Sequence, residues 1–129
     1  MNRLFWFSII IIAAIGGCGS RSAPQKKVII PDPPSWASRF EATKAIKNAE
    51  QRDEEFNSLA LTAASHGNLA DVKKAIAEIE LAAKKEQVAH GCAVTLAKHK
   101  HKEAAKEVAN LIADEKQREE TLKTIAEFN

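Results

Sequence analysis

The chain has 129 residues and a formal net charge of only +2 at pH 7, from 19 Lys and Arg against 17 Asp and Glu. This length fits one domain, and so small a positive excess argues against a dedicated nucleic-acid-binding protein, which needs a strongly basic surface. Two cysteines are too few for a disulfide-stabilised scaffold.

The amino-terminal segment predicts a secretory signal peptide. Arg3 precedes an apolar run over residues 4–15, which is shorter than the ~20 residues that a membrane-spanning helix needs. A positive residue followed by an apolar run of this length is typical of a signal peptide. The run ends at Ile15–Cys18, with two glycines before the cysteine. We therefore predict that residues 1–17 are a signal peptide.

Ile15–Cys18 resembles the lipobox of bacterial lipoproteins, in which an aliphatic residue and two small residues precede a cysteine. The resemblance implies cleavage between Gly17 and Cys18, and acylation of Cys18 that holds the protein on a lipid bilayer. It implies a protein of the bacterial cell envelope, and Gly19 in place of an aspartate favours the periplasmic face of the outer membrane over the inner membrane. An uncleaved signal anchor with an incidental cysteine is the alternative.

Residues 18–35 predict an extended linker behind the acylated cysteine. All four prolines of the chain lie here, and proline favours extended polyproline-II backbone over helix. The apolar segment Val28–Ile30 interrupts this pattern, and we expect it either to dock on the folded domain or to contact a partner.

Residues 36–129 predict an all-α domain. They contain no proline, are rich in strong helix formers, and carry apolar residues at helical spacing. Asp114 and the Gly67-Asn68 pair are typical helix boundaries, and Trp36 and Phe40 are expected to cover the first apolar edge. Six helices are predicted, near residues 36–48, 50–66, 69–81, 84–98, 102–112 and 114–128. The apolar positions at helical spacing include Ala42, Ala45, Ile46, Ala49, Leu111, Leu122, Ile125 and Ala126.

The helical region repeats itself with a regular period. A shift of the sequence by about 33 residues, a spacing typical of antiparallel helix pairs that stack into a solenoid, aligns similar residue types. The shift aligns Leu59 with Cys92 and Ile125, and His66 with His99. We therefore expect successive helix pairs to be built alike.

Residues 50–129 resemble tetratricopeptide repeats. Two sets of residues fall at the positions that this family conserves: Phe56, Leu59, Ala60, Ala63, Gly67, Val72, Ile76 and Ile79, and then Ala89, Cys92, Ala93, Leu96, Lys100, Ala105, Ala109 and Ile112. The family's tryptophan, tyrosine and closing proline are missing. The resemblance implies a short tetratricopeptide-like α-solenoid whose concave face binds a protein or peptide. The candidate binding residues on that face are Asn57, Thr62, His90 and Thr95.

The function that these patterns favour is that of a membrane-anchored adaptor or scaffold, with no enzymatic activity and no cofactor. Two alternatives stay open. One is a structural or stress-related envelope lipoprotein whose helices form a closed bundle without a binding groove. The other is a metal-binding lipoprotein that uses histidines, although His66, His99 and His101 are more simply explained as solvent-facing turn residues.

Other reactive side chains are interpreted as structural. Cys92 occupies an apolar position of the repeat, so we expect a small buried side chain rather than a nucleophile. The acidic cluster Asp53–Glu55 is expected on the solvated surface of a helix start. At the carboxyl end, exposed Leu122 or Ile125 is expected to support a homodimer.

Overall fold

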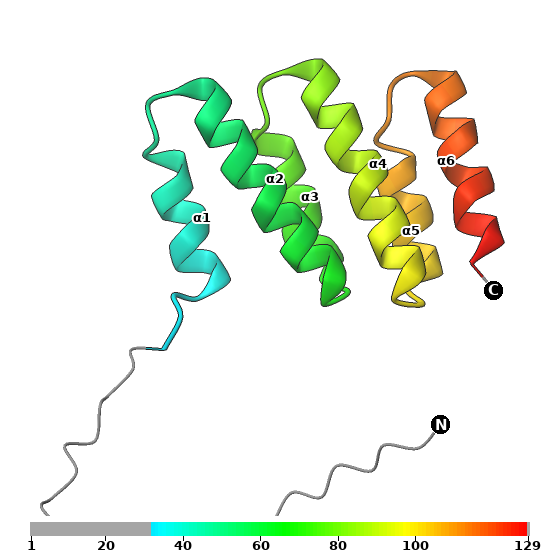
Figure 1. Ribbon diagram of the computed structural model, residues 1–129, viewed down its shortest axis with the longest axis horizontal. Coiled ribbons are helices and arrows are strands. Elements are labelled where there is room, and N and C mark those ends of the chain that lie inside the picture. The colour runs from blue at the N-terminus through cyan, green and yellow to red at the C-terminus, as the bar shows by residue number, and fades with distance from the viewer. Residues whose placement is uncertain (1–31, 129) are drawn as a thin grey trace, which may run out of the picture. The chain divides into compact units, whose positions relative to one another are not determined.

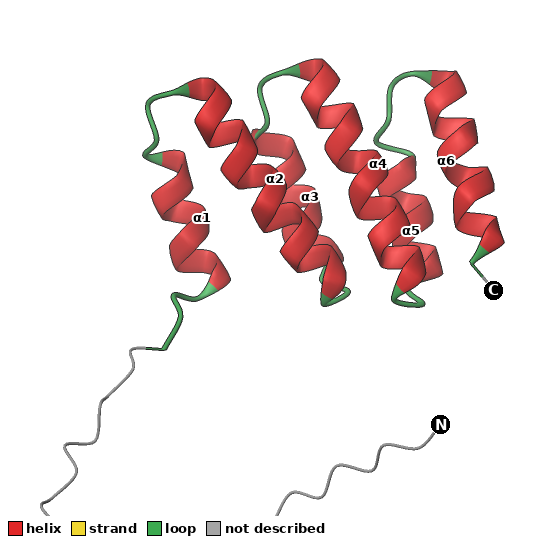
Figure 2. Cartoon of the chain, viewed as in Figure 1, coloured by secondary structure: helices red, strands yellow, loops and turns green. Residues whose placement is uncertain are grey.

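A computed structural model describes residues 32–128, which contain six α-helices and no strand, so the prediction of an all-α domain is confirmed (Figures 1 and 2). The helices are α1 (Trp36–Lys44), α2 (Ala49–Ser65), α3 (Leu69–Glu78), α4 (Ala82–Lys98), α5 (Lys102–Ala109) and α6 (Glu115–Glu127). They belong to one unit, Pro33–Asn129. The predicted signal peptide, Cys18 and Val28–Ile30 lie outside the described residues. No helix between residues 32 and 128 is long and apolar enough to cross a membrane.

The helices lie in two layers (Figure 1). Helix α4 contacts α2 on one side and α6 on the other, α3 and α5 contact each other behind this row, and α1 packs on α2. Successive helices run in opposite directions, so the connections alternate between two edges. We call the edge with residues 33–36, 66–68 and 99–101 the turn edge, and the edge with residues 45–48, 79–81 and 110–114 the loop edge.

An aromatic stack closes the core at α1. The ring centroids of Trp36 and Phe40 are 4.9 Å apart, and those of Phe40 and Phe56 are 5.4 Å apart. The indole Nε1 of Trp36 also donates a 3.2 Å hydrogen bond to the carbonyl oxygen of Leu59. Phe56 and Leu59 are fully buried, which confirms that Trp36 and Phe40 cover the first apolar edge.

Polar side chains cap the amino-terminal ends of four helices. The side-chain oxygens of Ser35, Asn48, Asn68 and Asp114 accept hydrogen bonds of 3.2, 2.9, 3.2 and 2.7 Å, respectively, from the backbone N–H three residues later. Each bond satisfies a donor that has no partner within its helix. The boundaries predicted at Gly67-Asn68 and Asp114 are therefore confirmed.

The carboxyl-terminal ends of α1, α3 and α5 differ from the prediction. Helix α1 stops at Lys44 rather than at residue 48, because Asn48 is the amino-terminal cap of α2 and the chain must turn before it. Of the apolar positions expected on α1, Ala42, Ala45 and Ala49 are exposed and Ile46 is half-buried. Its buried residues are Phe40 and Thr43. Similarly, α5 stops at Ala109, which places Leu111 in a loop with 44% of its surface exposed.

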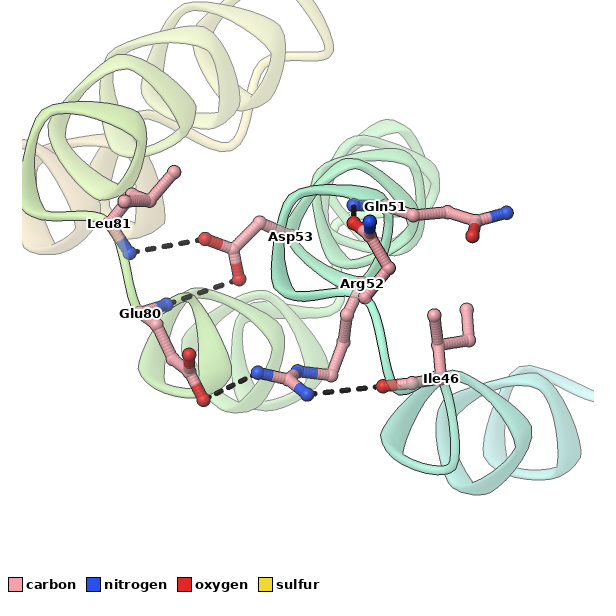
Figure 3. A network of polar contacts seen from close by, with 7 residues as sticks. Ile46, Gln51, Arg52, Asp53, Glu80 and Leu81 are labelled. Carbon is pink, nitrogen blue, oxygen red and sulfur yellow. Dashed lines mark hydrogen bonds and ion pairs between the residues drawn. The ribbon is translucent and has the colours of Figure 1, made fainter.

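Asp53 is buried, so the prediction of a solvated acidic cluster is wrong for this residue. Only 1% of its surface is exposed. Its Oδ1 and Oδ2 accept 3.1 Å hydrogen bonds from the backbone N–H groups of Glu80 and Leu81, respectively (Figure 3). Asp53 on α2 thus holds the loop that leads into α4, whose own cap residue, Leu81, provides no side-chain hydrogen bond. The loop ends α3 at Glu78.

Several contacts recur one or two periods of the repeat further along the chain. Glu86 aligns with Asp53, and its Oε1 accepts a 3.3 Å hydrogen bond from the backbone N–H of Asp114, which aligns with Leu81. Arg52 and Arg118 also correspond, because each donates from Nη1 to the carbonyl oxygen six residues earlier, at 3.1 and 3.2 Å. Residues that the sequence period aligns therefore make corresponding hydrogen bonds in the structure.

The turns after α2 and α4 also have the same backbone conformation. Gly67 and Lys100 have φ angles of +71° and +67°. The backbone N–H groups of Asn68 and His101 then donate 2.9 Å hydrogen bonds to the carbonyl oxygens of Ala63 and Leu96. This left-handed conformation is easily adopted by glycine and costs energy for other residues.

Replacing Lys100 with glycine is therefore expected to stabilise the protein by roughly 0.5–1 kcal/mol, after the entropic cost of glycine is subtracted. The reciprocal change, Gly67→Lys, should destabilise, because a Cβ atom there would lie 2.4 Å from Nε2 of His101 in addition to the unfavourable φ. Urea unfolding midpoints of the two variants measure both effects. A less stable Lys100→Gly variant would contradict the assigned turn geometry.

The last helix turns its apolar residues inward. Ile125 is 2% exposed and Leu122 is partly buried against the core, so the expectation that these two side chains form an exposed apolar surface is wrong. The exposed residues of α6 are mainly charged: Glu115, Lys116, Glu119, Glu120, Lys123, Ala126 and Glu127. Its outward face is therefore polar.

Candidate functional site

A groove of about 390 Å³ lies between α2 and α4. Its volume falls within the range of about 300–1,000 Å³ that is typical of ligand sites. The residues that line it are Glu54, Asn57, Leu61, Lys84, Gln87, Val88, His90 and Gly91. The lining thus combines charged, polar and apolar residues.

An ion pair bridges the two helices at one end of the groove. Lys84 Nζ on α4 pairs with Glu54 Oε2 on α2, and the Asn57 amide donates to Glu54 Oε1 at 3.4 Å. The hydrogen bonds from Lys84 and Asn57, followed by the charge of Lys84, lower the pKa of Glu54 below its ordinary value of 4.5. Glu54 is therefore ionised at neutral pH. Because this carboxylate is exposed, the pair adds little to stability.

Asn57 and His90 occupy equivalent positions of successive helix pairs and line the same groove. His90 Nδ1 lies 2.8 Å from Thr121 Oγ1 on α6. The Thr121 hydroxyl donates to the carbonyl oxygen of Gln117 at 2.7 Å, so its hydrogen is already used and Nδ1 must donate to it. His90 therefore connects α4 to α6 through Nδ1.

The other two predicted binding residues are not brought into this groove. The Thr62 and Thr95 hydroxyls each donate a 2.8 Å hydrogen bond to the carbonyl four residues earlier in their own helix. Thr62 lines a separate hollow of about 210 Å³ with Trp36 and His66 near the turn edge. Of the four predicted binding residues, only Asn57 and His90 therefore line the same groove.

Sequence reasoning missed most of the groove. The sequence places Glu54 in an acidic cluster expected on the solvated surface, and it does not indicate that Lys84, Leu61 and Gln87 line a groove. Gly91 lies inside a strongly helical segment, where glycine is tolerated but is less favourable than alanine. A Cβ atom at Gly91 would lie 3.6 Å from Cδ2 of Leu61, which is ordinary contact.

The second layer carries another hollow, of about 400 Å³, beside α3. It is lined by Lys73, Ile76, Ala77, Lys85 and Leu111. Both lysines already have partners, since Lys73 Nζ bonds Glu107 at 2.6 Å and Lys85 Nζ donates to the carbonyl oxygen of Ala77 at 3.2 Å. In this respect the hollow resembles the groove between α2 and α4, where Lys84, Glu54, Asn57 and His90 also have partners.

The histidines are spread over turns and helix contacts. His66 Nδ1 lies 3.0 Å from the carbonyl oxygen of Thr62, and His101 packs against Gly67. His99 is the carboxyl-terminal cap of α4. Within residues 32–128, no three His, Cys, Asp or Glu side chains come together in a way that could hold a metal ion.

Cys92 is fully buried, as predicted for an apolar position of the repeat. Its counterparts Leu59 and Ile125 are buried as well. Desolvation by this burial raises the pKa of the Cys92 thiol to about 12, so the thiol is protonated at neutral pH. A nucleophilic cysteine instead needs an environment that stabilises the thiolate.

No known protein family, curated protein or solved structure matches this chain.

Proposed function

We propose that this protein is a bacterial lipoprotein, anchored in the cell envelope through acylated Cys18, whose helical domain is an adaptor for a protein or peptide partner. The favoured location is the periplasmic face of the outer membrane. The observation that carries the adaptor role is the groove in which Asn57 and His90, at equivalent positions of successive helix pairs, face the same space.

A tetratricopeptide-like array is supported by two kinds of recurrence. The apolar positions quoted for the family resemblance are buried in both helix pairs, from Phe56 to Ile79 and from Ala89 to Ile112. The turn conformation of Gly67 recurs at Lys100, and the loop contact of Asp53 recurs at Glu86. Stacked helix pairs of this kind expose a continuous surface along one layer, which is suited to extended partners.

The lipid anchor is supported by the coincidence of Arg3, the apolar run over residues 4–15 and the lipobox-like Ile15–Cys18. More than one acyl chain at Cys18 would hold the protein firmly, since each buried methylene contributes ~0.8 kcal/mol. The linker over residues 18–35 would separate the helical domain from the bilayer.

The anchor is tested with a Cys18→Ser variant. The unsubstituted protein should incorporate labelled palmitate and sediment with envelope membranes, whereas Cys18→Ser should do neither. Cys92→Ser is the matched control, because Cys92 is the other cysteine of the chain; it should retain the label, whatever its effect on stability. Equal fractionation of the wild-type protein and Cys18→Ser would reject the anchor.

The adaptor role is tested separately at the groove. Saturable binding of an envelope protein should weaken at least tenfold in the double variant Asn57→Ala/Gln87→Ala, because both amides line the groove. The matched control is Glu119→Ala/Glu120→Ala, which removes two exposed side chains from the neighbouring helix α6. Equal loss in both double variants, or loss in neither, would reject the groove as the binding site.

A further inference from the structure

Helix α1 has the fewest neighbours of the helices in the described domain. It packs mainly on α2, whereas each of the other five described helices packs on at least two others (Figure 1). Phe40 and Thr43 are its only buried residues. Little apolar surface therefore opposes the separation of α1 from the domain.

The contacts that hold α1 on α2 involve few side chains. Trp36 donates a hydrogen bond to the carbonyl oxygen of Leu59, and Phe40 packs on Phe56. Thr43 uses its hydroxyl within α1, where it donates a 2.9 Å hydrogen bond to the carbonyl oxygen of Arg39. An isolated helix as short as α1, which has nine residues, is unstable in water. We therefore expect α1 to unravel once the Trp36 and Phe40 contacts break.

Helix α6, at the carboxyl-terminal end of the domain, is held by two neighbours. It packs on both α4 and α5. Glu86 on α4 accepts a hydrogen bond from the backbone N–H of Asp114, the cap residue of α6. His90 on α4 bonds Thr121 in the middle of α6. The two terminal helices are therefore unequally supported, and general fraying of chain ends would not distinguish them.

The structure of α2 and of the groove does not depend on α1. Asn48 caps α2 by accepting a 2.9 Å hydrogen bond from the backbone N–H of Gln51. Asp53 on α2 holds the loop before α4, and every residue that lines the groove belongs to α2 or α4. Separation of α1 therefore leaves these contacts in place.

We propose that α1 is an extensible part of the tether, which detaches from α2 and unravels while α2–α6 stay folded. Its role in the tether rests on the lipid anchor proposed above. The linker over residues 18–35 then continues through residues 36–48, which lengthens its maximum reach by about 40 Å. Because detachment uncovers part of the Phe56 ring, the closed form predominates. The open form carries an intact groove farther from the bilayer.

Native-state hydrogen exchange of the full-length protein in detergent micelles tests the opening. Backbone amides of α1 should exchange on the order of 100-fold faster than those of α4, because local opening needs less free energy than global unfolding. Low urea concentrations should hardly change exchange in α1 but should accelerate exchange in α4, since global unfolding exposes far more surface. Equal protection of α1 and α4, or of α1 and α6, would overturn the proposal.

Two variants separate local opening from global unfolding. Ile112 is 1% exposed and lies between α5 and α6, so it stays buried when α1 opens. Ile112→Val should therefore accelerate exchange in α4 about fivefold and leave exchange in α1 unchanged. Phe40→Ala should instead remove the protection of α1 while α4 stays protected. Equal acceleration of α1 and α4 in Ile112→Val, or a Phe40→Ala protein that does not fold, would overturn the proposal.

The anchor is judged by a separate measurement. Palmitate labelling reports the acylation of Cys18, whereas hydrogen exchange reports the opening of α1 whether or not Cys18 is acylated. Local opening of α1 in a protein that carries palmitate supports the extensible tether. Local opening in a protein without palmitate overturns the tether role together with the anchor. A palmitate-labelled protein whose α1 exchanges only by global unfolding overturns the extensible tether alone.

Discussion

Replacing Asp53 with alanine is expected to lower the free energy of unfolding by about 2–4 kcal/mol. The carboxylate is 1% exposed and accepts hydrogen bonds from the backbone N–H groups of Glu80 and Leu81. Its removal leaves two backbone donors at the start of α4 without their partner and opens a cavity between α2 and the loop. Urea unfolding followed by circular dichroism measures the change.

Two further variants test the cause of this loss. Asp53→Asn keeps the shape but directs an amide NH₂ group at one backbone N–H, so its stability should fall between those of the wild-type protein and Asp53→Ala. Glu55→Ala removes an exposed carboxylate from the same turn of α2 and should change stability by less than about 0.5 kcal/mol. An Asp53→Ala loss no larger than that of Glu55→Ala would contradict the capping role.

Replacing Phe56 with alanine is expected to cost about 3–5 kcal/mol, the range for a large aromatic side chain removed from a core. Phe56 is fully buried and contacts Phe40, which stacks on Trp36. The cavity should also loosen α1, so Trp36 fluorescence should shift to longer wavelength in the folded variant. Urea unfolding monitored at Trp36 reports both effects.

The control for this variant is Leu81→Ala, because Leu81 is 53% exposed despite being a large apolar residue. Its loss should change stability by less than about 0.5 kcal/mol. If Phe56→Ala and Leu81→Ala had similar effects, the burial of the aromatic stack would be contradicted.

Periodicity predicted the helices of this domain well, because each helix buries an apolar stripe whose spacing is visible in the sequence. The amino-terminal caps at Asn68 and Asp114 were equally predictable, because a cap side chain bonds a backbone N–H only three residues later in the sequence. Helix ends were harder to predict. The end of α1 depends on the competing cap Asn48, and the end of α3 depends on Asp53, which belongs to the preceding helix and is distant from Glu78 in the sequence.

The candidate groove was predicted only in part, because its composition depends on which faces of α2 and α4 meet. The repeat period places Asn57 and His90 at equivalent positions, and both do line the groove. The same period also pairs Thr62 with Thr95, whose hydroxyls instead bond within their own helices. Glu54 and Lys84 are not separated by a whole period, so their contact is not one that the period reveals.

Burial of charge was the least predictable property. Asp53, Glu54 and Glu55 are consecutive and chemically alike, yet one is buried, one is ion-paired across the groove and one is exposed. The difference arises from the rotation of about 100° between successive residues of a helix, which directs each side chain to a different neighbour. The amino-acid composition alone does not show which of the three carboxylates is buried.

The charged outward face of α6 has a consequence for assembly. If the outward face of α6 were apolar, a second copy of the chain could stack on it. Head-to-tail stacking that does not close into a ring produces a filament. Lys116, Glu119, Glu120 and Lys123 would have to be desolvated for such addition at α6. Addition of another copy at the outward face of α6 is therefore opposed.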